Sequence, residues 1–108
     1  MILIVSRVLL RNKFNGMVLW PFVILKDKKL TKDLFFLNHE RIHWRQQAEL
    51  MVVFFYLWYG LEFLFRIIQY KNKYKGYRNI SFEREAYANE KDLNYLKKRP
   101  FWRFLKYI

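Results

Sequence analysis

The only two histidines of the chain stand four positions apart, in the run His39-Glu40-Arg41-Ile42-His43. Residues at positions i and i+4 of a helix lie on one face, so both imidazoles can reach one metal ion. Zinc suits this arrangement, because two imidazoles and one carboxylate leave a fourth position for water. The pattern therefore predicts a Zn2+ site at His39 and His43. Glu40 is the predicted catalytic residue, which takes a proton from the metal-bound water as it attacks a peptide carbonyl and passes that proton to the leaving amine.

The residues around this motif favour a helix, although two histidines on the surface of an amphipathic helix would give the same spacing. Asn38 immediately precedes His39, where a helix N-cap is expected. Good helix formers follow over residues 46–51, and the helical pattern continues to about Tyr70. Gly60 is expected either to divide this stretch into two helices or to mark a close contact.

A third metal ligand is expected from a later helix over residues 82–98, with Ser81 as its N-cap and Pro100 after its end. Its first turn contains two carboxylates, Glu83 and Glu85. Glu85 lies nearer the apolar face of this helix, and Glu83 flanks the other side of that face. Because the two side chains project in different directions, only one is expected to bind the metal. The other is expected at the surface or near the positive helix terminus.

The motif and the later glutamates together resemble the gluzincin metallopeptidases, in which a glutamate of a downstream helix completes H-E-x-x-H. That glutamate often stands in an E-x-x-A-D pattern. Glu83 with Ala86 places a tyrosine at the aspartate position, and Glu85 with Ala88 places an asparagine there. The string Phe-Glu-Arg-Glu-Ala resembles small gluzincin-like proteins in which the first glutamate leads the pattern. The resemblance therefore favours Glu83 as the third ligand.

The length is similar to that of the minigluzincins, single-domain members of this group. The resemblance implies an α+β, mostly helical, small zincin-like domain, with a short β-sheet or ribbon whose edge strand holds an extended substrate above the cleft. It also implies that Gln46, one turn beyond His43, supports the site from behind the ligands, unless it is an ordinary surface glutamine. In that group a C-terminal segment can cover the zinc, but for residues 101–108 we expect an aromatic tail that completes the core. Tyr77, Arg78 and Tyr87 are candidates for stabilising the oxyanion.

The other expected elements are short. The chain is predicted to be a single domain over residues 1–108. Residues 2–5 form a strand or open a helix, and residues 17–25 form a strand that Pro21 interrupts or confines to a sheet edge. Residues 71–79 are polar and are expected to form a connecting loop. Residues 1–13 lack the positive start of a signal peptide and are expected to be part of the fold.

The net charge and the apolar stretch at residues 50–61 indicate which partners the protein could bind. The formal net charge is +12, with the lysines scattered as on a solvated face, and there are no cysteines, as in a reducing cytosol. Twelve apolar residues in succession are too few to span a bilayer, so we expect a core helix, with a membrane-surface helix as the alternative. The predicted location is cytoplasmic, with association to an anionic membrane left open. Nucleic acid is disfavoured as a partner, because no binding motif is recognisable.

Together these patterns predict a zinc-dependent metallopeptidase whose shallow cleft suits short peptides or unfolded proteins. Two alternatives remain open. The first is a latent or inactive zincin-like metal-binding domain, and the second is a basic protein that binds a membrane or a nucleic acid.

Overall fold

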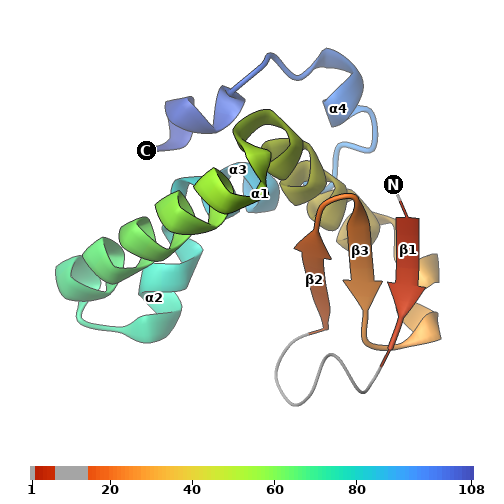
Figure 1. The fold of residues 1–108 in the computed structure, drawn as a ribbon, viewed down its shortest axis with the longest axis horizontal. Coiled ribbons are helices and arrows are strands. Elements are labelled where there is room, and N and C mark those ends of the chain that lie inside the picture. Colours follow the sequence, from red (N-terminus) through yellow and green to blue (C-terminus); the bar gives the residue numbers. More distant parts are fainter. Residues whose placement is uncertain (1, 7–14) are drawn as a thin grey trace.

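A long bent helix and a small sheet beside it dominate the computed structural model, which describes residues 2–6 and 15–108 (Figure 1). The described residues are mostly helical with one three-stranded sheet, so the predicted α+β class is confirmed. Of the N-terminal stretch expected to be part of the fold, residues 2–6 are described. Residues 1 and 7–13 of that stretch lie outside the described residues.

The sheet consists of β1 (Ile2–Val5), β2 (Gly16–Leu19) and β3 (Phe22–Leu25) in the order β1-β3-β2. β1 is parallel to β3, and β2 is antiparallel to it. The strand predicted over residues 17–25 is interrupted at Pro21, as one of the two alternatives had it, and its two parts form a hairpin. Pro21 lies in its turn, where the lack of a backbone N–H costs no ladder hydrogen bond. The inner side chains of the hairpin pack on the long helix.

The long helix α1 (Leu34–Tyr70) begins five residues before the predicted start. Asp33 is its N-cap, and its carboxylate accepts a hydrogen bond from the Phe36 N–H. The prediction of Asn38 as the N-cap is wrong. Asn38 lies buried inside the helix, and its amide donates to the backbone carbonyls of Asn89, Glu90 and Asp92.

The helix α1 bends at Met51, whose backbone angles are φ 60° and ψ 146° (Figure 1). The bend divides α1 into a first half, residues 34–50, and a second half, residues 52–70. Neither role predicted for Gly60 is correct, because it lies within an unbroken helical stretch and no atom would lie within 4 Å of a Cβ added there. The bend allows Leu50 and Phe55, on either side of it, to enter the same core cluster with Phe82.

Residues 71–79 are not the predicted loop, because they contain α2 (Lys73–Arg78), which Asn72 caps. This short helix packs directly on the backbone of α1. A Cβ at Gly76 would lie 2.9 Å from both the backbone nitrogen and Cγ1 of Ile67, so only glycine permits this approach.

The last helix predicted over residues 82–98 is two helices, α3 (Ser81–Asn89) and α4 (Tyr95–Lys98). Asn38 takes up carbonyls near the end of α3 that a continuing helix would use for its own hydrogen bonds. Ser81 is not the N-cap of α3. Its N–H and its hydroxyl both donate to the carboxylate of Glu62 in α1, at 2.5 and 2.7 Å.

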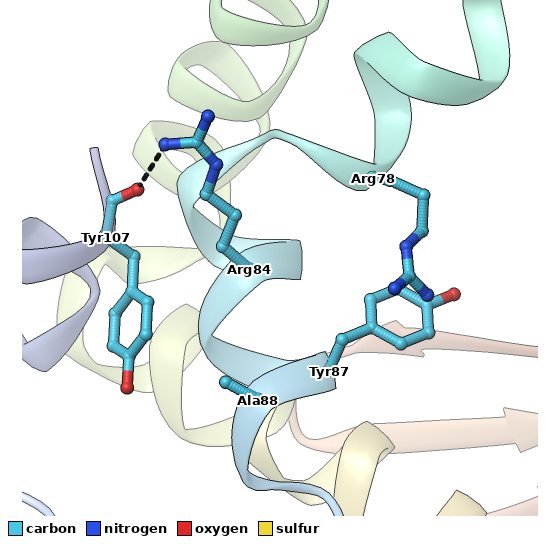
Figure 2. Close-up of a pocket in the computed structure, with 5 residues that line it drawn as sticks. All are labelled: Arg78, Arg84, Tyr87, Ala88 and Tyr107. Atoms are coloured by element: carbon cyan, nitrogen blue, oxygen red, sulfur yellow. Dashed lines mark hydrogen bonds between the residues drawn. The ribbon is translucent and has the colours of Figure 1, made fainter.

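The aromatic tail, residues 101–108, packs on α3 and completes the core. Phe104 is fully buried, and its ring centroid lies 4.6 Å from that of Phe82. Arg84 of α3 donates to the carbonyl of Tyr107 at 2.9 Å (Figure 2). None of the described residues that line the cavity at the histidines belongs to this tail.

Candidate metal centre

His39, His43 and Glu83 come together between α1 and α3. His39 Nε2 and His43 Nε2 lie 3.2 Å apart, and Glu83 Oε1 lies 3.2 Å from the first and 3.0 Å from the second. All three side chains are buried. Three lone-pair atoms at this separation repel one another unless a ring proton or a cation lies among them, so the group could bind a metal ion.

The size of this triangle fits a small transition-metal ion. Bonds of about 2.0–2.1 Å in a tetrahedral site place neighbouring ligand atoms about 3.3 Å apart. The three observed separations, 3.0 to 3.2 Å, lie within a few tenths of an ångström of that value. Two imidazoles with one carboxylate are the nitrogen and oxygen donors that such ions take.

Gln46 orients His43. Its amide nitrogen donates to the Phe82 carbonyl at 3.1 Å and to Glu85 Oε1 at 3.0 Å, so its oxygen faces the ring. That oxygen lies 2.8 Å from His43 Nδ1, which must therefore be the donor. His43 Nε2 is then left to face Glu83 with its lone pair. Gln46 is fully buried, as its proposed supporting role requires and as a surface glutamine would not be.

Glu85 does not reach the two imidazoles. It is fully buried in a separate network, where it accepts hydrogen bonds from Tyr95, Arg99 and Gln46. The expectation that the second glutamate lies at the surface is therefore wrong. Arg99 also donates to Glu49 at 2.6 Å. Burial lowers the pKa of Arg99, but its hydrogen bonds to Glu85 and Glu49 raise the pKa by more, so this guanidinium stays charged.

His39 has two neighbours, Glu90 and Tyr87, of which the sequence analysis did not name Glu90. Its Nδ1 lies 3.2 Å from Glu90 Oε1, an arrangement that leaves Nε2 for a metal when the carboxylate accepts the Nδ1 proton. Glu90 stands seven residues after Glu83, which is about two helical turns and places both on the same side of a helix. This spacing could have identified Glu90 as a neighbour of the site. The ring of Tyr87 packs edge-on against His39, with centroids 4.5 Å apart.

Tyr59 supports Glu83 from the second half of α1. Its hydroxyl donates to Glu83 Oε2 at 2.7 Å, which leaves Oε1 directed at the imidazoles. Burial raises the pKa of Glu83, but the charge of His43 and hydrogen bonds from both imidazoles lower the pKa well below its ordinary value. Burial and Glu83 both raise the pKa of Tyr59, so its proton stays in place.

The charge on His43 depends on Glu83 as well. Burial alone lowers the pKa of His43, but the charge and hydrogen bond of Glu83 raise it to about 9. Without a metal, a proton on this imidazole is therefore the cation that the triangle holds at neutral pH.

Glu40 lies beside the triangle, under the edge strand β2. Burial raises its pKa, while the neighbouring His43 and His39 lower it by less. A Cβ added to Gly16 of β2 would lie 3.1 Å from Glu40 Oε1 and 2.7 Å from Phe36 Cζ, so β2 approaches the glutamate closely. The strand, Glu40 and the triangle line one cavity of about 1120 Å3.

Of the three residues expected as oxyanion stabilisers, two line this cavity. The hydroxyls of Tyr77 and Tyr87 lie 2.8 Å apart at its wall. Arg78 instead lies over the Tyr87 ring, 3.7 Å from its centroid, and lines a smaller cavity of about 450 Å3 (Figure 2). Arg84 and Tyr107 line the other side of that smaller cavity.

The chain matches no model of a known protein family, and comparisons with curated proteins and with solved structures also give no match. The interpretation of the site therefore depends on its own geometry.

Proposed function

We propose that this chain is a zinc-dependent metallopeptidase of the gluzincin type, with His39, His43 and Glu83 as the zinc ligands. One observation carries the proposal. Two imidazole nitrogens and one carboxylate oxygen form a triangle of 3.0 to 3.2 Å, with Glu40 beside it in the same cavity. A surface pair of histidines on an amphipathic helix would have neither the burial nor the third donor.

Zinc, when bound, would lower the pKa of a coordinated water and polarise the scissile carbonyl. Glu40 provides the proton transfer: its carboxylate accepts a proton from the attacking water and returns it to the leaving amine. The raised pKa of Glu40 suits this double role, because an ordinary glutamate holds a proton too weakly at neutral pH. Gln46 and Glu90 hold the two imidazoles in the tautomers that such binding needs.

The edge strand β2 indicates how a peptide would bind. Its register with β3 points the backbone groups of Gly16 and Val18 away from the sheet. Gln47 already fills part of this edge, because its amide donates to the Val18 carbonyl and accepts from the Trp20 N–H. The open part is therefore the end at Gly16, next to Glu40. An extended peptide added there as a strand would pass over the triangle, which suits short peptides and unfolded chains.

The first test is the zinc content of the purified protein by elemental analysis, together with hydrolysis of a mixed peptide library. We expect about one zinc per chain, loss of that zinc in His39→Ala, and cleavage that a chelator stops. Glu40→Gln should retain zinc and lose about 1000-fold in turnover, within the range of about 100- to 10,000-fold for a general base.

The outcomes separate the proposal from its main alternative. Zinc binding with no cleavage that Glu40→Gln affects would indicate a zincin-like metal-binding domain without peptidase activity. Folded protein that takes up no zinc would contradict the metal site itself.

A further inference from the structure

The second half of α1 has one face that no other described element covers. Seven of its large apolar side chains are between 57% and 75% exposed, and Trp58 adds a partly exposed ring beside them. We call this group the apolar face: Val53, Phe54, Leu57, Trp58, Leu61, Leu64, Phe65 and Ile68. Exposed apolar groups of this extent are rare on monomeric proteins and mark an interaction surface.

The apolar face is continuous along the helix. At 3.6 residues per turn, its eight residues fall within an arc of roughly 140°, and no charged residue lies in that arc. The two charged residues of this half, Glu62 and Arg66, lie on the opposite side as a buried ion pair. That side packs on α2 and α3, which lie beside the second half of α1 (Figure 1). The second half of α1 is therefore amphipathic, with its apolar side outward. The core helix predicted for residues 50–61 is therefore only half buried.

The C-terminal tail extends this surface. The ring of Phe104 lies 5.1 Å from that of Trp58, which places the tail beside one edge of the apolar face. Phe101, Trp102 and Leu105 of the tail are exposed, as is Lys106. Aromatic rings next to a lysine are typical of segments that lie in the headgroup region of a bilayer.

The surface of the protein is strongly cationic. Five of its nine carboxylates are buried in the metal site and the ion-pair networks: Glu40, Glu49, Glu62, Glu83 and Glu85. Lys71, Lys73 and Lys75, just beyond the end of α1, are all exposed. The net charge of +12 therefore belongs mainly to the outside of the molecule, where it attracts an anionic lipid surface and repels a second copy of the chain.

We propose that the apolar face binds the surface of an anionic membrane, with the second half of α1 lying in the plane of the headgroups. The helix is long and apolar enough to cross a membrane by length and composition. Its hydrogen-bonded contact with α3 through Glu62 and Ser81, however, keeps one side of it in the protein. In-plane binding buries the apolar face without breaking that contact.

The experiment uses the full chain and vesicles of phosphatidylcholine, either alone or with one quarter phosphatidylglycerol. We expect the protein to sediment with the anionic vesicles and at least about tenfold less with the neutral ones. The double variant Leu61→Asp/Ile68→Asp should lose at least about tenfold in binding. Leu34→Asp/Leu93→Asp is the matched control, because it adds the same charge at exposed leucines outside the apolar face and should bind within about twofold of the wild type.

A wild type that does not sediment with anionic vesicles would overturn the proposal, as would equal loss of binding in both double variants. Self-association by light scattering that the Leu61→Asp/Ile68→Asp variant removes, without vesicle binding, would assign the apolar face to a second copy instead. Circular dichroism of each variant checks the fold, and Leu61→Gln provides a milder change that should give a smaller loss in the same direction. The result does not depend on zinc or on peptidase activity.

Discussion

The two halves of α1 invert the usual relation between polarity and burial in opposite ways. The first half, residues 34–50, buries polar side chains: Asn38, His39, Glu40, His43, Gln46 and Gln47. The second half, residues 52–70, exposes the apolar face. Buried polar groups and large exposed apolar groups are the informative departures from ordinary folding, and each of them supports one of the two proposals, the metal site and the membrane-binding face.

The difference has a physical cause in the partners that each half meets. In the first half, most buried polar groups find hydrogen-bond partners in the hairpin and around α3, as in the chain from His43 through Gln46 to Glu85 and Arg99. In the second half, Glu62 hydrogen-bonds to Ser81 of α3, whereas the side chains of the apolar face lie at the surface. The first half therefore buries its polar groups within the protein, whereas the second half leaves the apolar face exposed.

The largest expected effect separates the two glutamates near the first half. Glu83→Gln should weaken zinc binding more than 100-fold, because loss of a supporting residue alone costs about 10- to 100-fold. Glu85→Gln should leave zinc affinity within about tenfold but lower the free energy of unfolding by about 3 kcal/mol, because Arg99 loses the charge of its main buried partner. Competition with a chromophoric chelator measures the first effect, and urea unfolding measures the second. The reverse pattern would place the metal at Glu85.

The pH dependence of zinc binding should be the next largest effect. The pKa of His43 in the metal-free protein is about 9, so below that pH zinc must displace a proton. Apparent affinity should therefore rise about tenfold per pH unit between about pH 6.5 and 8.5 and level off above 9. The same proton stabilises the metal-free fold. Since the folded pKa is above the ordinary 6.5, this contribution is complete below pH 6.5 and is lost as pH rises through 9.

Both halves of this pH prediction can be checked on one protein. Chelator competition at several pH values gives the zinc affinity, and urea unfolding of metal-free protein at pH 6.5 and 9.5 gives the stability. A zinc affinity that does not change with pH, or a metal-free fold that becomes more stable at high pH, would contradict the prediction that His43 is protonated in the metal-free protein.

Tyr59 links the two halves and should have a smaller effect. Tyr59→Phe removes the hydrogen bond to Glu83 Oε2 and keeps the ring, so zinc affinity should fall about tenfold. Tyr56→Phe is the control, because the Tyr56 hydroxyl donates to the Val18 carbonyl and not to Glu83. Chelator competition measures both variants. Equal losses in the two would mean that the effect does not come from the hydrogen bond between Tyr59 and Glu83. No loss in Tyr59→Phe would mean that the packing of the ring alone supports the site.

Features of the site that depend on local sequence could be predicted, whereas those that depend on contacts between distant elements could not. The closeness of His39 and His43 depends on spacing along one helix and could be predicted. The apolar runs of the sheet could be predicted as well, but the hairpin over residues 16–25 and the strand order could not. Glu83 required a family resemblance, because Glu85 is equally near in the sequence. Tyr59 was out of reach: on an unbroken helix it would lie about 24 Å along the axis from His43. The network of Glu85 with Arg99 depends on the break between α3 and α4. Asn38 of α1 stabilises that break, so the break could not be predicted from the local sequence.

The bend at Met51 separates the two halves of α1, and its backbone is expected to be strained. Its φ of 60° with ψ of 146° lies near a region that only glycine enters readily, at a cost of about 1–3 kcal/mol. Met51→Gly should therefore raise the free energy of unfolding by about 1 kcal/mol, after the entropy cost of glycine in the unfolded chain. Val53→Gly is the matched control, because Val53 is equally exposed, at 68%, but lies in regular helix. The free energy of unfolding of Val53→Gly should fall by about 1 kcal/mol.

Urea unfolding of these two variants decides whether the bend is a built-in feature of the fold. If Met51→Gly is more stable and keeps its zinc, the backbone at Met51 is strained in the wild type, and the bend that brings Tyr59 to Glu83 is a built-in feature of the fold. If Met51→Gly is as destabilising as Val53→Gly, the bend carries no strain. The angle between the halves would then depend on packing against α3 alone, and the position of Tyr59 at the metal site would follow from that packing.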